Sequence, residues 1–276
     1  MSTQLLSATR TYLEGLVGLT NSGDAYIGAT LQLQELNEGY QASAYRYDWA
    51  QLLKRGGTVI VANVKKYGLP SDFRKFRQLF SLDNEFEEIE FNVLKSSVRS
   101  YAVDADSTFA TKQFWVSDLP TTASPAYVLT NNESAGNAVV IELDTVTGLS
   151  VGEEIFVNGT TPEFTSVSAV DTTAKTITAR LVNATGASKS LYRSSEIIHY
   201  QYYRSVTLLS ATGDTTLLPD ETDFIYPHYS AFLFYNRLEQ SERAQKQYEL
   251  WQSRLENAWL AWDKNSTGAV GEFSVG

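Results

Sequence analysis

The apolar positions of this chain follow a helical spacing near both ends and a strand-like spacing between them. From about Asp24 to Leu53, apolar or small residues recur three and four positions apart, which predicts a long amphipathic helix. A shorter helix is expected at residues 7–18, because Ser7 is a suitable N-cap and Gly18 a suitable stop. The N-terminal part is therefore predicted to be helical.

A second helical pattern lies near the C-terminal end. It begins near Asp220, a residue type favoured at N-caps, and keeps its phase as far as Trp262. Pro227 fits either a kink in this helix or its first position. Residues 265–276 combine small and polar residues with a few apolar ones, so they are expected to form a flexible tail.

One aromatic stretch allows two interpretations. Phe73, Phe76 and Phe80 have helical spacing, and arginine and lysine side chains stand between them. The favoured interpretation is a short helix with an aromatic core face and a solvated basic face. Contact of the basic side chains with DNA is the alternative.

Strand-like sequence dominates the middle of the chain. Gly56-Gly57 is expected to break the first long helix, and the β-branched residues 58–64 then predict a strand. After residues 121–125 the composition shifts to Ser, Thr, Val, Asn and Gly, and turn formers separate short β-branched runs. The strands expected here and on either side are residues 113–116, 138–143, 154–157, 164–170, 175–181 and a run within 193–209.

These patterns predict an α+β fold in which a helical-bundle core carries a small strand layer and an inserted all-β domain. The core is assigned to residues 1–124 and 191–264. The insertion, a sandwich or barrel, is assigned to residues 125–190, and the flexible tail to residues 265–276.

Composition narrows the possible functions. The chain of 276 residues contains no cysteine, which excludes disulfides, thiolate nucleophiles and zinc sites with sulfur ligands. Its net charge of −10 argues against a surface that grips the phosphates of nucleic acids. The N-terminus lacks a signal-peptide pattern, and no run approaches the roughly 20 apolar residues of a membrane span. We expect a protein made in the cytoplasm that does not cross a membrane.

Few residues in the sequence are candidates for chemistry. His199 and His228 are the two histidines, and neither stands in a metal-ligand or triad-like spacing. A phosphate-binding glycine loop and a nucleophile elbow are absent from the sequence. The sequence therefore predicts no catalytic residues, no metal and no cofactor. A glycosidase carboxylate pair within an acidic run is the alternative to a solvated face; the run consists of Asp83, Glu85, Glu87, Glu88 and Glu90.

Aromatic residues are abundant, with 16 Tyr, 13 Phe and 5 Trp. Tyr and Trp combine apolar area with a polar group, which is why they are enriched at protein interfaces. Core packing is the alternative role. The residues predicted to form a subunit or partner interface are Tyr45, Tyr47, Trp49, Trp259 and Trp262, with Val270 and Phe273 in the tail.

Two stretches carry a resemblance to a known family. The first is the long helix that ends in Tyr45-Arg46-Tyr47-Asp48-Trp49 and precedes Leu69-Pro70-Ser71-Asp72-Phe73. The second is Leu218-Pro219-Asp220-Glu221, which opens the C-terminal helix. Over residues 5–120 and 195–262 the chain resembles the head-to-tail adaptor proteins of tailed bacteriophages. The β insertion and Pro227 depart from the minimal pattern of that family.

The resemblance implies a structural role in the neck of a virion and no enzymatic activity. It implies a homo-oligomeric ring of twelve subunits around a channel through which DNA passes without sequence-specific binding. The ring would join the phage portal protein on one side to a tail or nozzle protein on the other. The C-terminal tail would extend to the portal, and the inserted β domain would decorate the outside of the ring or contact a tail protein.

Two other functions stay open at this point. A carbohydrate or cell-surface binding module on the inserted domain would need exposed aromatic rings, for which Tyr127, Phe156 and Phe164 are the candidates. A hydrolase built on the acidic run would need a second carboxylate that faces it across a cleft.

Overall fold

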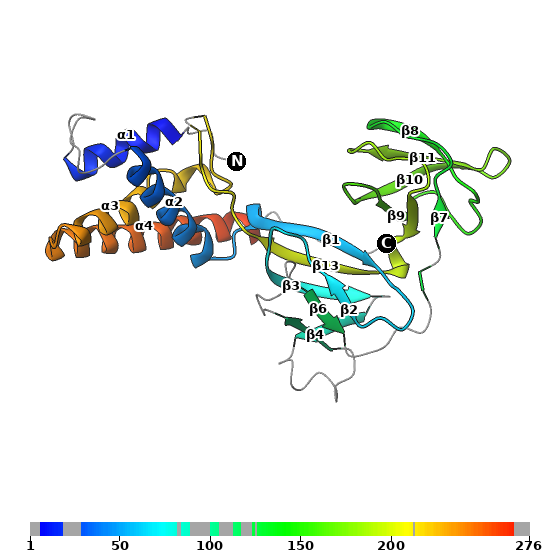
Figure 1. The fold of residues 1–276 in the computed structure, drawn as a ribbon, viewed down its shortest axis with the longest axis horizontal. Helices are drawn as coiled ribbons and strands as arrows, with labels where there is room; N and C mark the ends of the chain where they lie inside the picture. The colour runs from blue at the N-terminus through cyan, green and yellow to red at the C-terminus, as the bar shows by residue number, and fades with distance from the viewer. Residues whose placement is uncertain are drawn as a thin grey trace. The chain divides into compact units, whose positions relative to one another are not determined.

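The computed structural model describes residues 6–18, 29–81, 84–88, 100–104, 113–116, 123–124, 126–211 and 213–267. The chain divides into two compact units (Figure 1). The helical unit consists of Met1–Leu53 and Ser205–Gly276, and the strand unit consists of Lys54–Arg204. Val270 and Phe273 lie outside the described residues.

The helical unit contains α1 (Leu6–Val17), α2 (Ala29–Arg46), α3 (Tyr226–Arg237) and α4 (Ser241–Thr267). Helix α3 packs against each of the other three. α1 ends before Gly18, whose φ of +75° lies in the left-handed region that glycine favours. The prediction of a short N-terminal helix with a glycine stop is confirmed, although the helix begins one residue before the expected N-cap.

The predicted helix from Asp24 to Leu53 is too long. α2 ends at Arg46, and a 3₁₀ turn (Ala50–Leu52) then leads into the first strand. Trp49 is fully buried at this turn and has an extended backbone conformation, with φ −68° and ψ 130°. Residues 24–28 lie outside the described part of the chain.

The C-terminal helical pattern forms two helices instead of one. The chain turns back between α3 and α4 at residues 238–240, where Glu239 has a φ of +56°. A 3₁₀ turn (Asp220–Thr222) precedes α3. Pro227 lies in the first turn of α3, where its missing N–H costs no helical hydrogen bond.

The strand unit contains a seven-stranded sheet in the order β1-β13-β3-β4-β5-β6-β2. Its strands are β1 (Leu53–Val59), β2 (Lys66–Gly68), β3 (Phe73–Ser81), β4 (Asn84–Glu88), β5 (Ser100–Asp104), β6 (Gln113–Val116) and β13 (Ile197–Arg204). The sheet buries a core rich in Tyr and Phe. Phe76 meets Tyr101 and Phe114 edge to face, an arrangement that aromatic pairs favour.

Gly56 and Gly57 lie inside β1, so the prediction that they break a helix is wrong. A Cβ atom on Gly56 would stand 2.3 Å from the Tyr200 ring, and one on Gly57 would stand 2.9 Å from the Phe164 ring. Both distances are far below the separation at which carbon atoms attract. The two glycines are therefore required by rings that approach the backbone of β1.

The prediction of a helix at residues 73–80 is also wrong, because this segment is strand β3. Pairing with β13 skips one residue of β3 at Arg74 and another at Arg77. Such β-bulges place one extra residue in one strand of a pair. Inward-facing residues normally recur every two positions in a strand. Each bulge adds one residue, so the inward-facing positions of β3 recur every three residues, as they can in a helix. The buried residues that result are Phe73, Phe76 and Leu79.

A six-stranded sheet in the order β7-β12-β9-β10-β11-β8 forms the rest of the strand unit. Its strands are β7 (Tyr127–Val128), β8 (Gly136–Glu142), β9 (Glu154–Asn158), β10 (Glu163–Asp171), β11 (Thr176–Leu181) and β12 (Ser190–Arg193). Leu129, just after β7, forms a bridge with Leu143, just after β8. The sheet therefore curls until its two edges meet, and we call it the barrel. Its core is mainly aliphatic.

The strands predicted between residues 138 and 181 are confirmed as β8 to β11. The predicted fold class, however, is wrong. Two sheets form the strand unit, and the seven-stranded sheet is too large to be a minor layer on a helical bundle. The fold is mostly β-structure with a smaller helical part. Among the described residues, no helix is both long and apolar enough to cross a membrane.

Candidate functional site

Four of the predicted interface residues lie together in the helical unit. We call Tyr47, Trp49, Trp259 and Trp262 the C-terminal aromatic cluster. Tyr47 stacks on Trp259, with ring centroids 5.2 Å apart and ring planes 3° apart. Trp259 stacks on Trp262 at 5.6 Å. Trp49 meets Trp259 at 5.4 Å and Trp262 at 6.2 Å, in edge-on geometry. The cluster joins the end of α2 to the last turns of α4.

The rings of this cluster differ in exposure. Trp49 is fully buried, and its indole N–H donates a hydrogen bond to the Ser43 carbonyl at 3.1 Å. Tyr47, Trp259 and Trp262 are half-buried. Trp49 is therefore the buried base on which the cluster packs, and the other three rings each retain exposed area that a partner can cover.

The C-terminal aromatic cluster lies at one end of a longer stripe on α4. Positions three and four apart share one face of a helix, and this face carries Ala244, Tyr248, Trp251, Leu255, Trp259 and Trp262. Trp251 is buried and donates a hydrogen bond from its indole N–H to Ser43 Oγ at 2.8 Å. Leu255 is also buried. The middle of α4 is thus fixed in the core, whereas Trp259 and Trp262 beyond it are half-buried.

The remaining predicted interface residues are placed differently. Tyr45 is exposed at the end of α2, and its hydroxyl accepts a hydrogen bond from the Val206 N–H at 3.3 Å. Val270 and Phe273 follow α4 and lie outside the described residues.

A second aromatic group was not predicted as a unit. Tyr229 and Phe232 of α3 meet Tyr248 and Trp251 of α4, with centroid separations from 4.8 Å between Tyr229 and Trp251 to 6.4 Å between Tyr229 and Tyr248. Three of these rings are half-buried. The i, i+3 spacing within each pair was visible in the sequence, but the reversal of the chain between the two helices was not.

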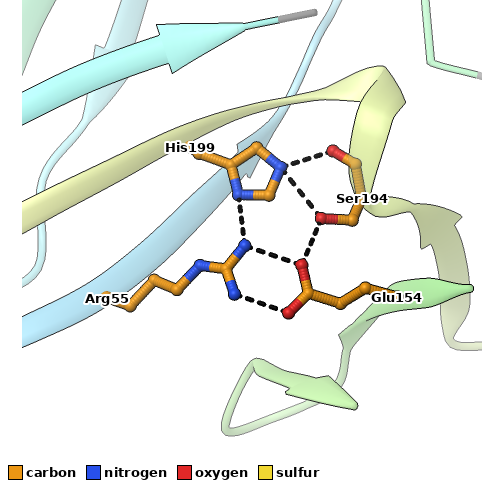
Figure 2. A network of polar contacts seen from close by, with 4 residues as sticks. All are labelled: Arg55, Glu154, Ser194 and His199. Carbon is orange, nitrogen blue, oxygen red and sulfur yellow. Dashed lines mark hydrogen bonds and ion pairs between the residues drawn. The ribbon is translucent and has the colours of Figure 1, made fainter. Parts of the chain in front are cut away.

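A polar network in the strand unit centres on His199 (Figure 2). Arg55 of β1 forms two hydrogen bonds with the Glu154 carboxylate of β9, at 2.5 and 2.7 Å. Ser194 Oγ donates a hydrogen bond to Glu154 at 2.6 Å. His199 contacts Arg55 through Nδ1 at 3.0 Å and Ser194 through Nε2. The network links β1 and β13 of the large sheet to β9 of the barrel.

The protonation pattern of this network differs from that of a serine nucleophile. A guanidinium can only donate, so Nδ1 of His199 must accept from Arg55, and the ring proton stays on Nε2. Nε2–H then faces the Ser194 carbonyl and cannot take a proton from Ser194 Oγ. In a catalytic triad, the carboxylate instead accepts from Nδ1–H and Nε2 is free to act as the base. This arrangement fixes side chains and does not activate Ser194.

Charge and packing stabilise the same network. Burial raises the pKa of Glu154, but hydrogen bonds from Arg55 and Ser194 and the charge of Arg55 outweigh this effect and hold its pKa below the ordinary value. The His199 ring is buried and stacks on Phe80 at 5.0 Å and on Phe164 at 5.1 Å. Glu154 therefore stays charged at neutral pH and keeps the two sheets joined.

The aromatic residues considered for carbohydrate binding are not exposed platforms. Tyr127 and Phe156 are buried. Phe164 is half-buried and lies beneath the Arg55 guanidinium, 4.1 Å from the ring centroid. Sugar binding by stacking would need a free ring face, and these three residues are engaged inside the strand unit.

The acidic run gives no side-chain geometry. Asp83 and Glu90 lie outside the described residues, and of Glu85, Glu87 and Glu88 the structure describes only the backbone, in β4. Within the described part of the chain, no group of three His, Cys, Asp or Glu side chains is arranged to hold a metal ion.

No family model matches the chain, and no curated protein matches it.

Proposed function

We propose that this protein is a structural subunit of the neck of a tailed bacteriophage, a head-to-tail adaptor that forms a ring beneath the portal protein. Twelve copies surround a channel through which DNA passes. One side of the ring binds the portal, and the other binds a tail or nozzle protein. The protein acts in the virion, and its function lies in its interfaces.

The observation that carries this proposal is the C-terminal aromatic cluster. It presents half-buried rings of Trp259 and Trp262 near the C-terminal end of α4, together with Tyr47, which follows α2 and stacks on Trp259. Partly exposed Tyr and Trp rings held rigidly by their neighbours are typical of interface anchors, because little side-chain entropy is lost when a partner covers them. Trp49 and Ser43 provide that rigidity.

The motifs behind the family resemblance are integrated into the fold. Leu218 is fully buried, and the neighbouring Leu217 N–H donates to Tyr40 Oη at 2.8 Å. Asp72 accepts hydrogen bonds from Lys54 at 2.7 Å and from Tyr202 at 2.9 Å. These contacts give the motif residues roles in holding each unit together, as a structural function requires.

Mass photometry of the purified full-length chain, alone and mixed with a candidate portal protein, tests the proposal. We expect particles of ring size to form with the portal. The double substitution Trp259→Ala and Trp262→Ala should abolish them, whereas Leu260→Ala, an exposed position on the same helix, should not. The proposal would be contradicted if the chain bound none of the candidate portal proteins, or if the double variant assembled like the wild type.

A further inference from the structure

His228 is a buried histidine at the point where three helices of the helical unit meet. It belongs to α3, and it is 2% exposed. Its Nδ1 lies 2.6 Å from Gln247 Oε1 of α4. Its Nε2 lies 2.9 Å from Arg254 Nη1, also of α4, and 3.3 Å from Tyr12 Oη of α1. One imidazole therefore makes polar contacts with both α1 and α4.

These partners fix the protonation state of the ring. Arg254 has no acceptor atom, so Nε2 of His228 must be unprotonated and accept from it. The proton then lies on Nδ1 and is donated to Gln247 Oε1. The Tyr12 hydroxyl also donates to Nε2, and its ring meets the imidazole edge to face at 5.9 Å. The packing thus requires a neutral histidine with a defined tautomer.

A proton added to Nε2 would disrupt this arrangement. The new N–H would point at the donors of Arg254, and two cations would stand 2.9 Å apart with the imidazolium buried. The two side chains of α4 that contact the ring lie seven positions apart, two turns of one helix face. Loss of these contacts weakens the attachment of α4 in its central part.

We propose that His228 is an acid-sensitive latch: neutral, it fastens α4 to α1 and α3, and its protonation releases the central turns of α4. This device is independent of the proposed neck function. The groups that face the ring are Tyr12 from α1 and Gln247 and Arg254 from α4. Among the residues that the structure describes, Arg254 is the charged side chain whose field acts on the ring, and it lowers the pKa of His228.

The direction of the pH effect follows from the environment. Burial lowers the pKa of His228 below 6.5, the hydrogen bond to Gln247 opposes this effect, and the charge of Arg254 lowers the pKa further. When folding lowers the pKa of a base, stability is fully present above the unfolded pKa and is lost as the pH falls toward the folded one. The latch is therefore closed at neutral pH and opens in mild acid.

Hydrogen exchange of the full-length chain tests the latch directly. Amide protection factors along α4, corrected for intrinsic exchange, would be compared at about pH 7.5 and about pH 5, the range that brackets histidine titration. We expect protection in the central turns of α4 to be lower at pH 5 than at pH 7.5, by up to about 30-fold, since pH 5 lies about 1.5 units below the ordinary histidine pKa and each unit corresponds to about tenfold. The His228→Gln variant should lose this pH response and keep its protection constant.

Two further variants keep the test decisive if His228→Gln does not fold. Gln247→Glu places a carboxylate against Nδ1–H, which stabilises the imidazolium in the packed state, and it should therefore reduce the loss of protection between pH 7.5 and pH 5. Gln245→Glu, an exposed position on the same helix, is the matched control and should leave the size of that loss unchanged. Equal losses of protection in these two variants, a wild-type loss in Gln247→Glu, or a wild-type α4 whose protection is the same at both pH values would overturn the latch.

Discussion

The barrel and the helical unit differ in what they bury and in what they expose. The barrel encloses a mainly aliphatic core, with Ile141, Ile155 and Leu191 fully buried, and its edges close on one another. The helical unit buries the ionisable side chains of Glu35, Asp223 and His228, and leaves several of its largest rings half-exposed along α4. The barrel core therefore contains mainly groups that do not titrate, whereas the helical unit contains groups that can respond to pH or to a binding partner.

This difference assigns stability and function to different parts of the chain. A closed aliphatic core gains free energy from burial alone and does not depend on pH. Half-exposed Trp rings add little to the stability of a monomer and buried ionisable groups reduce it, so both are retained where they serve another purpose. The predictions below test this division, in order of decreasing effect.

The largest effect is expected for Trp49→Ala. Because Trp49 is fully buried and holds the C-terminal aromatic cluster from below, its truncation should lower the free energy of unfolding by about 3–5 kcal/mol. Urea titration followed by Trp fluorescence measures this, since the tryptophans other than Trp115 lie in the helical unit. Leu260→Ala, nearly half exposed on α4, is the control and should change stability little. If Trp49→Ala lowered the free energy of unfolding only slightly, the cluster would not depend on Trp49.

A pH-dependent effect is expected for Glu35→Gln. Glu35 is 1% exposed and pairs with Arg237 Nη1 at 3.1 Å. Burial raises its pKa to about 7, the charge of Arg237 opposes this effect, and Glu38 adds to it. A raised carboxyl pKa contributes stability that is full below the unfolded value of 4.5 and is lost as the pH rises through about 7.

The stability of Glu35→Gln relative to wild type should therefore rise by about 2 kcal/mol between pH 5 and pH 8. If the stabilities of the two proteins changed with pH in the same way, the raised pKa of Glu35 would be contradicted. Ile141→Val in the barrel provides the comparison: it should cost about 1 kcal/mol at every pH.

A smaller effect is expected for Glu154→Gln. The substitution removes a charged acceptor from Arg55 and Ser194, but the Arg55–Glu154 pair is more than a third exposed, so solvent screens part of the loss. Stability should fall by about 1–2 kcal/mol. A double-mutant cycle with Arg55→Met should show coupling between the two sites, and simple additivity would show that the network does not act as a unit.

The smallest effect on folding is expected for Trp262→Ala. Its ring is half-buried and stacked on Trp259, so its removal should cost the monomer only about 1 kcal/mol. Its effect on assembly should be far larger than its effect on stability. If Trp262→Ala reduced assembly no more than it reduced stability, the role of Trp262 would be packing within the subunit.

Local sequence patterns predicted the barrel strands β8 to β11, and in the larger sheet they predicted β6 and β13 but not β3. The barrel strands alternate and are separated by turn formers such as Asp171, whose carboxylate accepts from the Thr173 and Ala174 N–H groups. β3 was misread because bulges at Arg74 and Arg77 gave its buried residues a helical period. Alternation is a local property, but a bulge is visible only when the partner strand is known.

The candidate site was predictable in its residue types and not in its geometry. Aromatic abundance pointed to Trp259 and Trp262, yet nothing local indicated that Trp49 is their buried support. The network around His199 joins residues as far apart as 144 positions, and the contact of Tyr12 with His228 spans 216. Such pairs are set by tertiary packing, which leaves no spacing signal in the sequence.

The measurement that tests the central claim most directly is hydrogen exchange of the chain, alone and mixed with a candidate portal protein. If function lies in the helical unit, binding should protect the last turns of α4 around Trp259 and Trp262 and leave the barrel strands β7 to β12 unchanged. Protection confined to the barrel would contradict the account and make the barrel the binding part of the molecule.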